Sequence, residues 1–194
     1  MIPFHELSSL DNIPSFVKVI VVDNPQIKCK FNKKCLLVSD ENKLEEVLFK
    51  SLSYLFGKEI FNVLIVGIDP GRTYGVVALA DGFPLIFKTF NDVYSLVVFI
   101  EKLFHFSPSK ERVIRIGTGG GVYFDLLLKS LWKTFLNFNL QTSIELVNES
   151  SVNSLAVKKF GFSVDVEDAY NIALTKGKKI EFGELYDRED LRKK

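Results

Sequence analysis

The sequence has few of the residues that build disulfide frameworks or metal sites of sulfur and imidazole. Its 194 residues include two histidines and two cysteines, Cys29 and Cys35. The spacing of the cysteines matches neither a CxxC redox pair nor a zinc knuckle, and no histidine lies nearby to complete a zinc site. We therefore expect two reduced cysteines with no metal-binding role.

The chain also lacks a long apolar run and an excess of charge of either sign. No uncharged apolar stretch approaches the ~20 residues of a membrane-spanning helix, and the N-terminus lacks the basic start and apolar core of a secretory signal. The formal net charge is +1, so nucleic acid could be bound only through a local basic patch. These absences predict a cytoplasmic protein with no membrane partner.

What is present is typical of a soluble globular protein: 47% of residues are hydrophobic, including 18 phenylalanines, and 25% are charged. Residues 1–60 predict a small ββα-like unit, with a strand in 16–23, a second strand or a hairpin in 29–40, and an amphipathic helix that ends at Gly57. Residues 61–180 form the main predicted domain, and residues 181–194 are a charged C-terminal tail.

In the main domain, three strands come first and strand–helix units follow. The expected elements are strands 62–69, 74–80 and 84–90, helix 91–106, strand 112–119, helix 122–137, strand 143–149, a short helix from about 151, and a last helix from near Val164. Three antiparallel strands followed by strand–helix units predict an α/β fold, with a mixed five-stranded sheet flanked by helices on both faces.

Acidic residues stand where this pattern would bury apolar ones. Asp69 ends an apolar strand, and Glu149 ends another strand that has Glu145 near its start. On the last helix, Asp165 and Asp168 share a stripe with small residues that should pack on the sheet. A local explanation is open for each: Asp165 as a helix cap, Asp168 as a favourable first-turn acid, and Glu145 as an edge charge reaching solvent.

Taken together, the acids predict a metal site if the strand ending in Asp69 is central and the last helix crosses it. Clustered carboxylates repel one another unless they take up protons or bind cations. Oxygen ligands of this kind suit Mg²⁺ or Mn²⁺, and two such ions about 4 Å apart are a common arrangement for phosphodiester hydrolysis. The candidate catalytic and metal-binding residues are Asp69, Glu149, Asp165 and Asp168.

Two segments carry a resemblance to a known family. "GIDPGRTYGVVAL" resembles the first strand and turn of RuvC-type Holliday-junction resolvases, and "DVEDAYNIAL" is similar to their final helix. The resemblance covers roughly residues 61–177 and implies an RNase H-like fold. It makes Asp69 the metal ligand of the first strand, and Asp165 and Asp168 the acids of the last helix.

The middle acid departs from the resolvase pattern. RuvC-type enzymes place a Glu on the fourth strand, where this chain reads "RVIRIGTGGG". YqgF-type proteins have instead a Gly after that strand and an Asp-Glu-Arg motif after the fifth. "VNESSVNSLA" resembles a degraded form of that motif, with Glu149 in the Glu position and Asn148 and Ser150 replacing its neighbours. Whether Glu145 or Glu149 is the middle acid stays open.

The resemblance implies a nuclease that uses one or two Mg²⁺ or Mn²⁺ ions on branched DNA or structured RNA. It also implies a homodimer, because a four-way junction has two scissile strands. Candidate phosphate-binding residues are Arg72, Lys158, Lys159, Lys176 and Lys178, for which a merely solvated role is the alternative.

Two other functions remain open. A catalytically inactive RNase H-like module that binds nucleic acid or protein would fit the degraded motif. An ATP-binding fragment of the actin-like kind, suggested by "GIDPGRTYG" and "GTGGG", would need a second domain that 194 residues do not supply.

Overall fold

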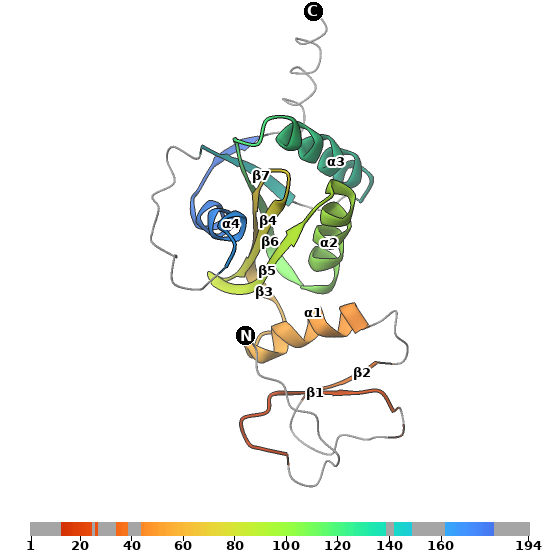
Figure 1. Ribbon diagram of the computed structural model, residues 1–194. Coiled ribbons are helices and arrows are strands. Elements are labelled where there is room, and N and C mark those ends of the chain that lie inside the picture. Colours follow the sequence, from red (N-terminus) through yellow and green to blue (C-terminus); the bar gives the residue numbers. More distant parts are fainter. Residues whose placement is uncertain are drawn as a thin grey trace, which may run out of the picture. The chain divides into compact units, whose positions relative to one another are not determined.

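The chain divides into two compact units, Met1–Glu59 and Ile60–Lys194. A computed structural model (Figure 1) describes residues 13–24, 26, 34–38, 44–138, 142–148 and 162–180. The predicted short helix near 151 and the tail 181–194 lie outside these residues. Within the described residues, no helix is both long enough and apolar enough to cross a membrane.

The first unit contains a two-stranded sheet and one helix. Strands β1 (Val19–Val22) and β2 (Lys34–Leu37) pair in parallel, and helix α1 (Leu44–Leu55) buries Val47 and Phe49. Gly57 follows the helix with a φ of 67°, a left-handed conformation that commonly ends helices. Cys35 of β2 is disulfide-bonded, so the expectation of two reduced cysteines was wrong.

The second unit is built on a six-stranded sheet with the strand order β5-β4-β3-β6-β7-β8. Its strands are β3 (Phe61–Asp69), β4 (Tyr74–Ala80), β5 (Phe83–Phe90), β6 (Ser109–Gly117), β7 (Thr142–Val147) and β8 (Lys178–Ile180). Strands β3, β4 and β5 are antiparallel neighbours, whereas β6 and β7 run parallel to β3. This arrangement confirms the expected mixed α/β class, with three antiparallel strands followed by strand–helix units. The third strand of the antiparallel set, β5, lies at one edge.

One element of the sheet was not predicted. Strand β8 pairs antiparallel with β7 over three residues, Ile144 with Ile180 and Leu146 with Lys178 among them. The prediction of five strands was therefore one short. A three-residue strand that reads "KKI" has too few alternating apolar positions to be recognised from periodicity.

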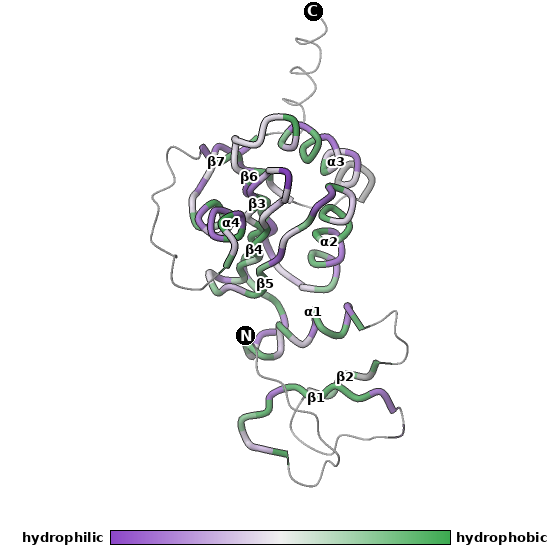
Figure 2. The backbone as a smooth tube through the Cα atoms, in the orientation of Figure 1, coloured by the Kyte–Doolittle hydropathy of each residue, from purple (hydrophilic) through white to green (hydrophobic). Residues whose placement is uncertain are grey.

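Helices cover both faces of this sheet (Figure 1). Helices α2 (Val93–Phe106) and α3 (Val122–Phe138) lie on one side and α4 (Val164–Leu174) on the other. Strand β4 is buried along its whole length and is mostly apolar (Figure 2), because it lies inside the sheet with helices over both faces. Helix α2 begins where the Asp92 carboxylate accepts a hydrogen bond from the Ser95 N–H at 2.8 Å, as N-cap residues do.

Candidate functional site

Asp69 is the last residue of the central strand β3, and its side chain lies on the α4 face of the sheet. Side chains alternate along a strand, so Asp69 shares a face with Gly67 and Ile65. Ile65 packs against the apolar cluster that joins α4 to the sheet, whose α4 members are Val166, Ala169 and Ala173. The strand therefore points its final carboxylate toward the helix that carries the two predicted acids.

Helix α4 approaches β3 and β4 very closely because both strands present glycine to it. A Cβ atom at Gly67 would lie 2.6 Å from the main-chain nitrogen of Ala173, and one at Gly75 would overlap the carbonyl group of Asp165. Real Cβ atoms essentially never approach other atoms this closely. Glycine is thus required at both positions, and the helix rests directly on the strand backbones.

This close packing brings Asp165 next to Asp69. Gly75, which contacts the Asp165 backbone, is the residue paired with Asp69 across the β3–β4 ladder. Asp165 is half-buried, and Asp168 lies one turn further along α4 and is exposed. The sheet and α4 therefore place an acid from the first strand and an acid from the last helix at one end of the sheet.

The turn after Asp69 is packed against the glycine-rich loop that precedes α3. Gly120 has a φ of 74°, and a Cβ atom there would overlap the carbonyl oxygen of Pro70. Backbone conformation and close approach thus explain the glycine at position 120 of the run "GTGGG". Arg72, in the same turn as Pro70, is exposed and lies three residues after Asp69.

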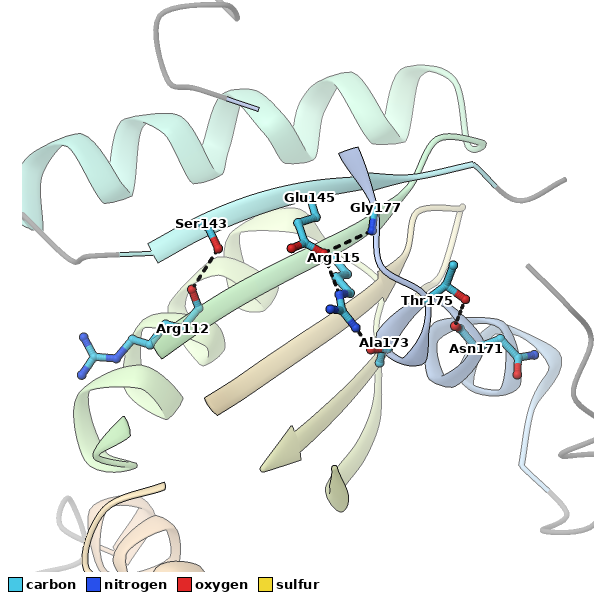
Figure 3. A network of polar contacts seen from close by, with 8 residues as sticks. All are labelled: Arg112, Arg115, Ser143, Glu145, Asn171, Ala173, Thr175 and Gly177. Atoms are coloured by element: carbon cyan, nitrogen blue, oxygen red, sulfur yellow. Dashed lines mark hydrogen bonds and ion pairs between the residues drawn. The ribbon is translucent and has the colours of Figure 1, made fainter. Parts of the chain in front are cut away.

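Glu145 lies on the α4 face, where it is held in a network with Arg115 and Gly177 (Figure 3). Its Oε2 atom accepts a hydrogen bond from Arg115 Nε at 2.9 Å and from the Gly177 N–H at 3.2 Å. In the strand register, Glu145 is level with Arg115 and Gly67, two residues before the Asp69 level. Glu145 is therefore part of an ion pair, which removes it as a candidate for the middle acid.

Arg115 is the residue of this network that sequence reasoning missed. It is the one charged residue among the last five of β6, which read "VIRIG", and its side chain is only 13% exposed. A charged residue inside an apolar strand was a signal that a partner lies on a neighbouring strand. Finding Glu145 as that partner required the β6–β7 register, which the sequence does not specify.

Strand β6 supplies no acid beside Asp69. Ile116 pairs with Ile68, so the next residue, Gly117, stands level with Asp69. Gly117 in turn pairs with Val147 of β7. Asn148 follows β7 and is exposed, and Glu149 lies outside the described residues. The structure thus leaves Glu149 as a prediction.

The predicted basic residues do not form one group. Lys178 stands on β8, three strand spacings from β3 through the pairs Leu146–Lys178, Ile116–Leu146 and Ile68–Ile116, which corresponds to roughly 14 Å. Lys176 precedes it in the turn after α4, and both lysines are exposed. Lys158 and Lys159 lie outside the described residues. Among the predicted basic residues that the structure describes, Arg72 is the one nearest to Asp69 in the sequence.

The described acids fit a single hard cation that takes its other ligands from water and substrate phosphates. No group of three Asp, Glu, His or Cys side chains suited to a metal is found among the described residues. Mg²⁺, however, is usually held by one or two carboxylates, with waters and substrate phosphates as the other ligands. Asp69 and Asp165 supply two carboxylates on one face at one end of the sheet, which is this kind of donor set.

Comparisons with known proteins find similarity in structure and none in sequence. No protein-family model matches the chain, and no curated protein matches it. Its structural neighbours include RuvC from Thermus thermophilus in complex with a Holliday junction substrate, at 14% identity and a TM-score of 0.46, and a second T. thermophilus RuvC structure, at 16% identity and a TM-score of 0.42. Each match covers 66% of this chain and 96% of the RuvC chain.

Proposed function

We propose that residues 61–180 form a metal-dependent nuclease that acts on structured nucleic acid. The observation that carries this proposal is the contact of the Asp165 backbone with Gly75, the ladder partner of Asp69. Helix α4 can bring Asp165 to the end of the sheet where β3 ends in Asp69, because two strands have no side chain at the crossing. An apolar pair would serve packing better at such a place, so the two acids point to a ligand-binding role.

Asp69 and Asp165 would hold the ion, with Asp168 and Glu149 completing the set of acids. Bound Mg²⁺ or Mn²⁺ supplies a Lewis acid for the scissile phosphate and lowers the pKa of an attacking water. The chain itself contributes fixed positions: Asp69 is anchored by the β3–β4 and β3–β6 ladders, and Asp165 by the contact of α4 with Gly75. Arg72, exposed in the adjoining turn, would bind a neighbouring phosphate.

Branched DNA is the first substrate to test, because the T. thermophilus RuvC neighbour is described in complex with a Holliday junction. The proposal includes a homodimer, since two active sites are needed to cut two strands of one junction. Structured RNA is the second substrate to test. The full chain should be assayed in cytoplasm-like salt, because phosphate contacts weaken steeply as salt rises.

The deciding experiment compares two variants that remove one negative charge each. Asp69→Asn should abolish Mn²⁺-dependent cleavage and weaken Mn²⁺ binding measured by calorimetry. Glu111→Gln is the matched control, because exposed Glu111 pairs with Val63 near the opposite end of β3, and it should behave as wild type. Cleavage of all branched DNA and RNA substrates at an unchanged rate by Asp69→Asn would refute the mechanism.

A second function, binding of nucleic acid or protein without catalysis, is favoured by one observation. On β6, the fourth strand of the domain, the residue level with Asp69 is Gly117, whereas RuvC-type enzymes carry a Glu on their fourth strand. If wild-type protein retains branched DNA in a gel-shift assay but neither binds Mn²⁺ nor cleaves, this second function is the correct one.

A further inference from the structure

The buried ion pair between Arg115 and Glu145 joins two strands to the end of α4. The two side chains are 13% and 11% exposed and meet at 2.9 Å. Each also reaches a main-chain group near the C-terminus of α4: Arg115 Nη1 donates to the Ala173 carbonyl at 2.6 Å, and Glu145 Oε2 accepts from the Gly177 N–H (Figure 3). The pair therefore holds both the last turn of the helix and the turn that follows it.

Net stabilisation is a poor explanation for this pair. Burying two charges costs desolvation free energy that their attraction often only offsets, and apolar residues of similar volume commonly serve equally well. What the pair provides is a defined geometry at the C-terminal end of α4. A guanidinium beside the last carbonyls of a helix is favourably placed in the helix dipole, and its planar fork can serve two acceptors at fixed angles.

Where α4 crosses β3 and β4, glycines of the strands contact the main chain of the helix. Gly67 meets the main chain of Ala169 and Ala173, and Gly75 meets that of Asp165. Small residues permit close approach but give little resistance to sliding or rotation of the helix. The hydrogen bonds to Ala173 and Gly177 fix the position of α4 along its axis. Ala173 lies eight residues, or about 12 Å, from Asp165 along the helix.

We propose that Arg115 and Glu145 are positioning residues that fix α4 on the sheet and thereby set the separation between Asp165 and Asp69. This inference rests on the proposed metal-dependent function of those two acids. It predicts that the pair governs metal affinity without touching the ion. Residues that orient metal ligands without binding the metal themselves typically change metal affinity by about 10- to 100-fold when they are replaced.

The test separates positioning from stability by means of a double variant. Arg115→Met alone leaves the Glu145 carboxylate buried without its ionic partner, so the protein should lose stability. Arg115→Met/Glu145→Met removes both charges and should regain a urea midpoint close to wild type, but it still lacks the hydrogen bonds to Ala173 and Gly177. Its Mn²⁺ affinity, measured by calorimetry on the full chain, should be about tenfold weaker than wild type.

Leu127→Ala is the control for general loss of stability, because Leu127 is fully buried on α3, over the opposite face of the sheet. It should lower the urea midpoint and leave Mn²⁺ affinity within twofold of wild type. Amide hydrogen exchange is measured on all variants. In the double variant, exchange should be faster over α4 and the following turn than in Leu127→Ala, although the double variant is the more stable protein.

The outcomes distinguish this inference from the proposed function. Wild-type Mn²⁺ affinity and wild-type exchange over α4 in the double variant would overturn the positioning role. If wild-type protein binds no Mn²⁺, the proposed function fails, and exchange alone then decides whether the pair fixes α4. Faster exchange confined to α4 supports it, and unchanged exchange overturns it.

Discussion

Replacing Gly75 by alanine should disturb the helix that carries Asp165 more than any other single methyl group at this end of the sheet. The added Cβ would overlap the Asp165 carbonyl and lie 3.1 Å from the Asp165 Cβ. These are main-chain and Cβ atoms of a helix packed on two strands, so no flexible side chain can move aside. The N-terminal half of α4 must shift away from β4, carrying Asp165 with it.

The cost follows from the packing. Inserting a methyl group into a well-packed region typically costs about 1–3 kcal/mol. With a urea m-value of about 2 kcal/mol/M, the unfolding midpoint should fall by about 0.5–1.5 M. Trp132 on α3 is the single tryptophan of the chain, so its fluorescence reports unfolding of the second unit alone.

The matched control is Gly71→Ala, in the turn between β3 and β4. Its Cβ would meet the Thr73 carbonyl oxygen at 3.2 Å, a tight contact but not an overlap. This variant should unfold within about 0.3 M urea of wild type, which corresponds to about 0.5 kcal/mol. A Gly75→Ala protein as stable as Gly71→Ala, with wild-type Mn²⁺ affinity, would refute the reasoning that α4 rests on the backbone of β4.

Three further predictions concern single groups. The pKa of Tyr74 is raised by burial and, to a smaller extent, by Tyr123 and Asp92. The folded protein should therefore lose stability as pH rises above 10 through that raised pKa. Urea midpoints measured across this range should fall less in Tyr74→Phe than in wild type. Hydrogen bonds from Ser95 lower the pKa of Asp92. The stability that Asp92 contributes as a helix cap should therefore be complete above pH 3.8 and be lost as pH falls through the lowered pKa. An acid titration followed by circular dichroism should show this loss in wild type and lack it in Asp92→Asn. Because Cys35 is disulfide-bonded, unfolded, unreduced protein should yield no free thiol from it with a thiol reagent; one reactive Cys35 per chain would contradict this.

The sequence predicted the second unit well because its elements are long and bounded by clear signals. Strand β4 has the predicted limits, 74–80, since an apolar run there is closed by the Asp81–Gly82 turn. Helix α4 begins at Val164 as expected. The parallel pairing of β1 with β2 was not specified, because parallel strands are joined by crossovers that leave no turn signature.

The candidate site was predicted only in part, because strand register and helix packing are not specified by local sequence patterns. The sequence left Glu145 and Glu149 open as the middle acid, and only the β6–β7 register shows that Glu145 is paired with Arg115. The glycines at 67 and 75 could be read as strand breakers or turn residues in the sequence. Their role as the contact surface of α4 depends on which helix packs there, a tertiary property that local patterns do not encode.

The backbone contact between α4 and the two glycines makes the fold independent of the acids that it brings together. Gly67, Gly75, Ala169 and Ala173 let the helix pack directly on the strand backbones, through main-chain and methyl contacts that involve neither carboxylate. Carboxylates held close together also repel one another until a cation binds. Substituting Asp69 or Asp165 by asparagine should therefore give a folded protein that is at least as stable as wild type. In evolution, such a scaffold can lose or regain its chemistry by single substitutions without first losing its structure.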